Sequence, residues 1–99
     1  MVGRQLRIIW TRQAREALKT IFNYYKEKSL QGAINVKYDI LTITGSIRFA
    51  KQYQIDDINP KYRRVVVRHY KILYTETGNT VRILDIISTL QDPAKLRSK

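Results

Sequence analysis

The 99-residue chain has no cysteine, two prolines and four glycines, and its 8 acidic residues are outnumbered by 19 lysines and arginines. Without cysteine there is no disulfide framework, no thiolate metal site and no cysteine nucleophile. No stretch approaches the roughly 18 continuous apolar residues of a membrane span, and no apolar segment typical of a secretory signal follows the polar start. We therefore expect a cytoplasmic protein that does not associate with the membrane.

The charge is strongly unbalanced, with a formal net charge of +11. Such an excess in a short chain favours acidic partners, which are either nucleic acid or an acidic protein. The chain is long enough for one hydrophobic core and too short for two, and 43% of its residues are hydrophobic. The sequence contains no repeat or linker, so we expect a single domain over residues 1–99.

The first half of the chain has the pattern of a short strand followed by two helices. Leu6–Trp10 is rich in β-branched and aromatic residues, as strands are. Thr11 is a suitable N-cap for a helix that carries one apolar stripe and ends near Lys28. Ser29 can cap a second helix running to about Lys51, although the Thr and Ile content of this segment leaves a strand as an alternative.

The second half changes to a period of two after a polar loop at Gln52–Lys61. We expect strands at Tyr62–His69, Tyr70–Glu76 and Thr80–Ser88, with a tight turn at Gly78-Asn79. The predicted fold is α+β in the order β-α-α-β-β-β, with an N-terminal strand and a helical hairpin packed on one face of an antiparallel sheet. The other face of the sheet is expected to be uncovered.

A cluster of basic residues marks the first of these three strands. The segment from Lys61 to Lys71 contains five lysines and arginines and no acid. Because side chains of a strand alternate between faces, Arg64 and Arg68 should share one face, and Arg63 and His69 the other. Arginine suits phosphate because its planar fork donates two parallel hydrogen bonds. The candidate binding residues are Arg63, Arg64, Arg68, His69 and Arg82, and Lys71 extends the same patch.

Other readings of these residues remain open. A basic sheet face can simply be solvated and protect an edge strand from aggregation. His69 is the only histidine and has no neighbouring serine or paired carboxylate in the sequence, which favours a structural role over general-base catalysis. Asp56-Asp57 reads as a solvated loop. No metal-ligand spacing or phosphate-binding glycine loop is present, so we expect no metal and no cofactor.

The apolar and aromatic positions also form an ordered set. It includes Ile8-Ile9-Trp10-Thr11, Tyr62-Arg63, Tyr70-Lys71-Ile72-Leu73-Tyr74 and, near the end, Gln91 and Pro93. In this order the chain resembles the RelE/ParE toxin superfamily over nearly its whole length. The resemblance implies the toxin of a bacterial type II toxin–antitoxin system, of the kind that stabilises plasmids, arrests growth and is neutralised by a cognate antitoxin with an acidic toxin-wrapping segment.

The superfamily divides by target, and the resemblance bears on both branches. RelE-like members cut mRNA on the ribosome without a metal, whereas ParE-like members inhibit DNA gyrase. Arg63 and Lys71 match basic positions of the nucleases, but Leu90 stands where an arginine usually follows the last strand. We therefore expect a ParE-like gyrase inhibitor. The first alternative is a ribosome-dependent mRNA endonuclease in which Arg63 and Lys71 would be the catalytic residues. The second is a non-toxic RNA-binding module. Enzymatic activity stays open, as does assembly into a homodimer or a toxin–antitoxin hetero-oligomer.

Overall fold

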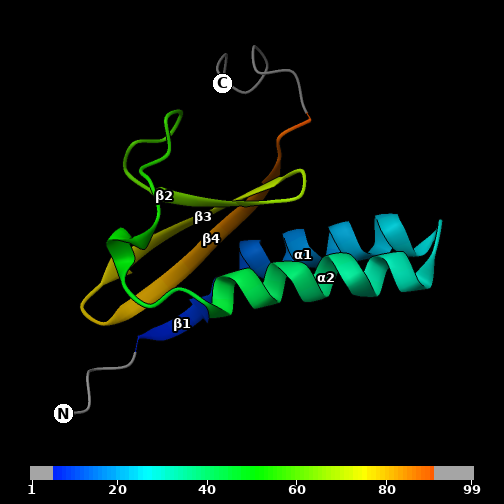
Figure 1. Ribbon diagram of the computed structural model, residues 1–99, viewed down its shortest axis with the longest axis horizontal. Helices are drawn as coiled ribbons and strands as arrows, with labels where there is room; N and C mark the ends of the chain where they lie inside the picture. Colours follow the sequence, from blue (N-terminus) through cyan, green and yellow to red (C-terminus); the bar gives the residue numbers. More distant parts are fainter. Residues whose placement is uncertain (1–5, 91–99) are drawn as a thin grey trace.

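The computed structural model describes residues 6–90, so Gln91 and Pro93 lie outside the described residues. Its elements are β1 (Arg7–Trp10), α1 (Arg12–Lys26), α2 (Leu30–Gly45), the short 3-10 helix η1 (Ala50–Gln52), β2 (Arg63–Val67), β3 (Tyr70–Thr77) and β4 (Thr80–Ser88) (Figure 1). This order confirms the predicted α+β class and the β-α-α-β-β-β succession.

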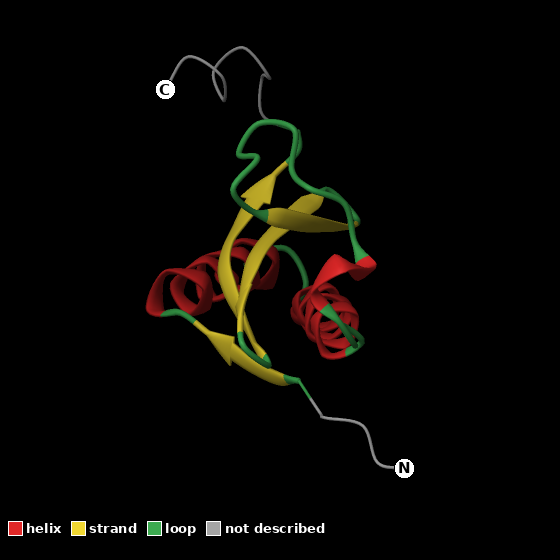
Figure 2. Ribbon diagram, turned by 90° about the vertical axis from the view of Figure 1, so that its left-hand side faces the viewer, coloured by secondary structure: helices red, strands yellow, loops and turns green. Residues whose placement is uncertain are grey.

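The four strands form one sheet in the order β1-β4-β3-β2. The pairs β2–β3 and β3–β4 are antiparallel, as expected, but β1 runs parallel to β4, so the sheet is mixed. The β3–β4 hairpin reverses the chain, so β4 runs in the same direction as β1 and pairs with it in parallel. Leu73 pairs with Asp85 and Tyr74 with Ile83, so an extra residue, Leu84, bulges from β4. Bulges increase local twist, and the sheet is visibly twisted in Figure 2.

Both helices begin at the predicted caps. The Thr11 hydroxyl accepts a hydrogen bond from the Ala14 amide at 3.2 Å, and the Ser29 hydroxyl accepts one from the Gly32 amide at 3.0 Å. Each bond satisfies an amide that the first helical turn leaves without a partner. The Thr11 hydroxyl also donates to the Ile83 carbonyl of β4 at 2.9 Å, which ties the start of α1 to the sheet.

The second helix is shorter than the sequence predicts, because it ends at Gly45 and not near Lys51. Glycine is a poor helix former, and Ser46 follows it with a hydroxyl that donates to the Ile43 carbonyl at 2.6 Å. The chain then leaves the helix and makes the single turn of η1. The predicted continuation to Lys51 is therefore wrong, whereas the choice of helix over strand for this segment is confirmed.

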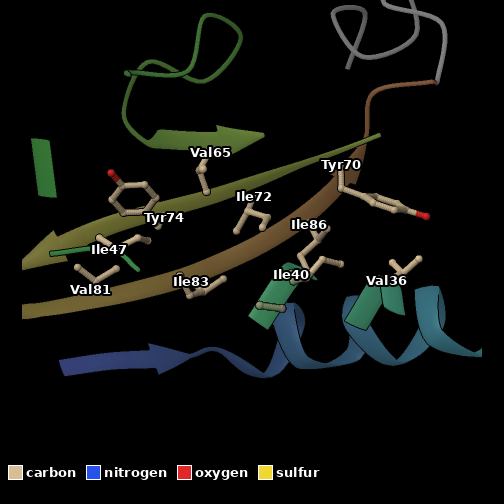
Figure 3. Packing of buried hydrophobic residues seen from close by; sticks show 11 residues of the cluster. Val36, Ile40, Ile47, Val65, Tyr70, Ile72, Tyr74, Val81, Ile83 and Ile86 are labelled. Atoms are coloured by element: carbon tan, nitrogen blue, oxygen red, sulfur yellow. The ribbon is translucent and has the colours of Figure 1, made fainter. Parts of the chain in front are cut away.

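The core lies between the helical hairpin and the sheet. Figure 3 shows Val36 and Ile40 of α2 facing apolar side chains of the strands. The sheet contributes Val65, Tyr70, Ile72, Tyr74, Val81, Ile83 and Ile86, all of which are buried. Side chains at every second position of a strand share a face, and this explains why the period of two in the sequence marks the core positions.

Candidate functional site

Strand β2 has the predicted alternation but ends earlier than expected. Val65 is 4% exposed and faces the core, whereas its neighbour Val66 is 53% exposed. The strand ends at Val67, and Arg68 and His69 form the two-residue turn between β2 and β3. Arg68 and His69 therefore do not continue the two faces of the strand, and Arg64 and Arg68 do not form the shared patch that alternation predicts.

Arg68 has an unusual backbone conformation and a specific partner. Its φ of 55° lies in the left-handed region, which costs a residue with a Cβ about 1–2 kcal/mol. The Arg68 guanidinium donates from Nε to Asp39 Oδ2 of α2 at 2.7 Å. This ion pair connects the β2–β3 turn to the second helix and offsets part of the backbone cost.

Lys71 is buried in an ion pair on the sheet face opposite the core. Its ammonium lies 2.8 Å from Asp56 Oδ1, and the two side chains are 9% and 0% exposed. Asp56 Oδ2 also accepts hydrogen bonds from the amides of Asn59 at 2.7 Å and Ile58 at 3.2 Å. Burial by itself raises the pKa of the Asp56 carboxyl, but Lys71 and these two amides outweigh burial and hold the pKa below its ordinary value.

Arg64 belongs to the same group of charges. Its guanidinium donates to the Ile55 carbonyl at 2.9 Å and lies 4.0 Å from carboxylate oxygens of both Asp56 and Asp57. The segment that links η1 to β2 thus supplies acids that neutralise Arg64 and Lys71. The expectation of an uncovered face is wrong here, because Lys71 and Leu73 on that face are 7% and 4% exposed.

The expectation that Asp56-Asp57 is a solvated loop is wrong for Asp56, which is fully buried, and holds for Asp57, whose side chain is 71% exposed. The sequence around it, Asp56-Asp57-Ile58-Asn59-Pro60, is typical of an Asx turn, in which a carboxylate caps the amides two and three residues later. That signal predicts the turn that is observed. It contains no information on burial, because the lysine that pairs with Asp56 lies in β3.

Arg63 points to the other side of β2 and is not neutralised in this way. Its guanidinium donates to the Tyr53 carbonyl at 2.9 Å. It lines a small cavity of about 190 Å³ together with Lys51, Lys61, Tyr74, Thr75 and Glu76. Tyr74 is fully buried, and this burial raises the pKa of its phenol. Among residues 6–90, no carboxylate forms an ion pair with Arg63.

The remaining candidate residues lie apart from this cavity. Arg82 is exposed on β4, where it pairs with Ile9 of β1 and Thr75 of β3. His69 is exposed in the turn, and its carbonyl accepts from the Thr89 amide at 2.7 Å. Leu90 is 73% exposed after β4. The structure thus separates the six candidate residues into the β2–β3 turn, a buried ion-pair cluster, the Arg63 cavity and an exposed position on β4.

A second concave surface lies on the helical hairpin, and the sequence analysis did not single it out. This surface, which we call the hairpin groove, has a volume of about 440 Å³. Its apolar lining comes from Trp10, Leu18, Phe22 and Leu41, and its basic lining from Arg15, Lys19 and Lys37. The Lys37 ammonium lies 5.5 Å from the Phe22 ring centroid, and Arg15 donates to the Trp10 carbonyl at 2.7 Å.

The outer face of α2 continues the apolar surface away from the groove. Leu30, Ile34 and Tyr38 are 55%, 45% and 67% exposed and recur every four residues along the helix. Residues four apart share one helical face. Large exposed apolar patches are typical of interaction sites, so this face is a candidate for one. The spacing is visible in the sequence, but it does not distinguish an exposed apolar face from one packed against the rest of the protein.

The part of the chain that the structure describes contains neither a membrane-spanning helix nor a cluster of metal ligands. No helix within residues 6–90 is long and apolar enough to cross a membrane. Within the same residues, no three side chains of His, Cys, Asp or Glu gather where they could hold a metal ion.

The fold and these surfaces define a small, basic α+β protein with an apolar groove on its helical hairpin. Comparison with models of protein families gives a more specific assignment. Residues 8–93 match the model of the ParE toxin of type II toxin–antitoxin systems, parDE, and the chain belongs to this family. No curated protein sequence matches it significantly.

A solved structure described as the chromosomal ParDE TA system from P. aeruginosa has a similar fold. It is 20% identical in sequence, the match covers 87% of this chain and 98% of that chain, and the TM-score is 0.76. At this identity the likeness shows the fold alone. The family assignment confirms the toxin–antitoxin class that the sequence resemblance implies, and it implies a cognate antitoxin as partner.

Proposed function

We propose that this toxin arrests bacterial growth by binding a protein target such as DNA gyrase, and that it does so in the cytoplasm. The observation that carries the proposal is the burial of Lys71. A nuclease of the RelE type would need this ammonium to stabilise charge on the reacting phosphate, but Asp56 holds it at 2.8 Å with 9% of the side chain exposed. Leu90 supplies no charge after the last strand. Inhibition by binding requires neither residue.

The hairpin groove is our proposed site for the antitoxin. Its apolar lining suits the apolar face of an amphipathic helix, and its three basic residues favour acidic residues beside that face. The antitoxin would thereby cover the groove and the apolar face of α2 in a hetero-oligomer. Phe22→Asp should abolish co-purification with the antitoxin, whereas Thr20→Asp, at an exposed position of α1, should preserve it. Retained binding by Phe22→Asp would place the antitoxin elsewhere.

The target is tested with purified toxin freed of antitoxin. Supercoiling of relaxed plasmid by gyrase should be inhibited at micromolar toxin, and addition of the antitoxin should restore it. If the toxin arrests growth on expression but leaves supercoiling unchanged at these concentrations, gyrase is not its target.

A second candidate function, ribosome-dependent mRNA cleavage, is favoured by Arg63. This half-buried arginine forms no ion pair with a carboxylate of residues 6–90. In a translation extract, cleavage of mRNA that requires intact ribosomes and is lost with Arg63→Ala would support this function. High-level expression without any effect on growth would instead favour the third candidate, an RNA-binding module without toxicity.

A further inference from the structure

The cavity around Arg63 has an excess of positive charge that nothing in the described chain neutralises. Lys51 of η1, Lys61 of the loop before β2 and Arg63 of β2 line it, and Glu76 of β3 is the one acid in the lining. The other cations of β2, β3 and their connecting turn each have a carboxylate partner: Arg64 with Asp56 and Asp57, Arg68 with Asp39, and Lys71 with Asp56.

This difference is informative because Arg63 is the half-buried member of the cavity. A partly desolvated guanidinium that forms no ion pair is less favourable than a paired one unless an anion arrives from outside. Its Nη1 donates to the Tyr53 carbonyl at 2.9 Å, which fixes the orientation of the planar fork. Fixed donors bind an anion with less loss of side-chain entropy than mobile ones do.

We infer that this cavity is a binding site for a dianionic phosphate group, either the terminal phosphate of a monoester such as a 5′-nucleotide or inorganic phosphate. Three cations and one carboxylate give the lining a formal charge of +2. A phosphate monoester carries about −1.5 to −2 at neutral pH, whereas an internal phosphodiester or a carboxylate carries a single charge. The volume of about 190 Å³ above the buried ring of Tyr74 suits one small group. The cations come from two parts of the chain, Lys51 from η1 and Lys61 and Arg63 from the start of β2 and the loop before it.

The inference does not depend on the gyrase proposal and is tested without gyrase. The purified toxin is titrated by calorimetry with inorganic phosphate, and with a short oligonucleotide that carries either a 5′-phosphate or a 5′-hydroxyl. We expect phosphate to bind and the 5′-phosphorylated oligonucleotide to bind more tightly than its 5′-hydroxyl form. Equal binding of the two oligonucleotides would show attraction to the nucleic-acid backbone only and would overturn the inference.

Charge variants separate the cavity from the general basicity of the protein. Arg63→Gln should weaken phosphate binding by about tenfold or more, because hydrogen bonds from a charged group are lost. Glu76→Gln should strengthen it, because the opposing charge is removed. Lys26→Gln removes one exposed positive charge from the end of α1 and should change nothing. Equal weakening by Arg63→Gln and Lys26→Gln would also refute a specific site. Far-UV circular dichroism of each variant excludes misfolding as the cause.

Discussion

Replacing Lys71 by methionine tests whether the buried pair with Asp56 holds the loop against the sheet. At 2.8 Å the two charges attract by about 6 kcal/mol at an effective dielectric constant of about 20. Much of this attraction is offset by the cost of removing both charges from water. Breaking such a pair from one side typically costs about 3–5 kcal/mol, because the remaining charge is buried without its partner.

The structure places Lys71→Met near the lower end of that range. Asp56 keeps its hydrogen bonds from the amides of Asn59 and Ile58, and Arg64 lies 4.0 Å away. We therefore expect a loss of about 3 kcal/mol, which corresponds to about 12–24 °C in melting temperature for a domain of this size.

The assay is urea unfolding followed by the fluorescence of Trp10, the only tryptophan. The double variant Asp56→Asn/Lys71→Met removes both charges while the asparagine oxygen still accepts from the loop amides, so it should recover part of the loss. Lys26→Met, at an exposed position, is the control for replacing a lysine by methionine. If Lys71→Met unfolds at the same urea concentration as the native protein, the pair does not stabilise the fold.

Three further predictions concern pH and backbone conformation. Because the folded-state pKa of Asp56 is lowered, its ionised form stabilises the fold at neutral pH. This stabilisation is lost as the pH falls from about 4 through the folded-state pKa. The urea unfolding of Asp56→Asn should therefore depend less on pH in this range than that of the native protein. Arg68→Gly should be more stable than Arg68→Ala by about 1 kcal/mol, because both lose the Asp39 pair but only glycine adopts a φ of 55° without strain. Gly78→Val should lower the melting temperature because Gly78 has a φ of 64°, and Gly78→Asn should lower it less.

The fold was predictable because its main signals are local. The Thr11 and Ser29 caps and the change of period after the polar loop each depend on residues close together in the sequence. The Gly78-Asn79 turn has a sequence signature, and it lies between β3 and β4 as expected. The Arg68-His69 turn has none, because an arginine gives no indication of a positive φ. For this reason the sequence predicts a strand that continues to His69, whereas β2 ends at Val67.

The charge pairing was not predictable, because it depends on register. Lys71 and Asp56 are brought together only when β3 and the loop before β2 are placed relative to one another. Asp39 lies in α2, far in sequence from Arg68, and the side of α2 that faces the turn follows from packing of the hairpin. A count of basic residues between Lys61 and Lys71 treats all of them as alike, whereas the fold gives each a different environment.

That difference in environment changes what the net charge of +11 means for recognition. Strands β2 and β3 present Arg64 and Lys71 on one face and Arg63 on the other, and the acids of the preceding loop neutralise only the first face. An acidic partner is therefore attracted to the cavity of Arg63 and to the basic lining of the hairpin groove more than to the face covered by the loop. Asp57→Asn removes a negative charge and restores part of the positive potential on the covered face, so the association rate of an acidic antitoxin should rise. Lys37→Gln removes a positive charge that lines the groove, so the association rate should fall. We expect the fall in Lys37→Gln to be larger than the rise in Asp57→Asn. Stopped-flow association at low salt measures both rates, and an equal and opposite change in the two variants would show that long-range charge alone, and not the groove, guides the partner.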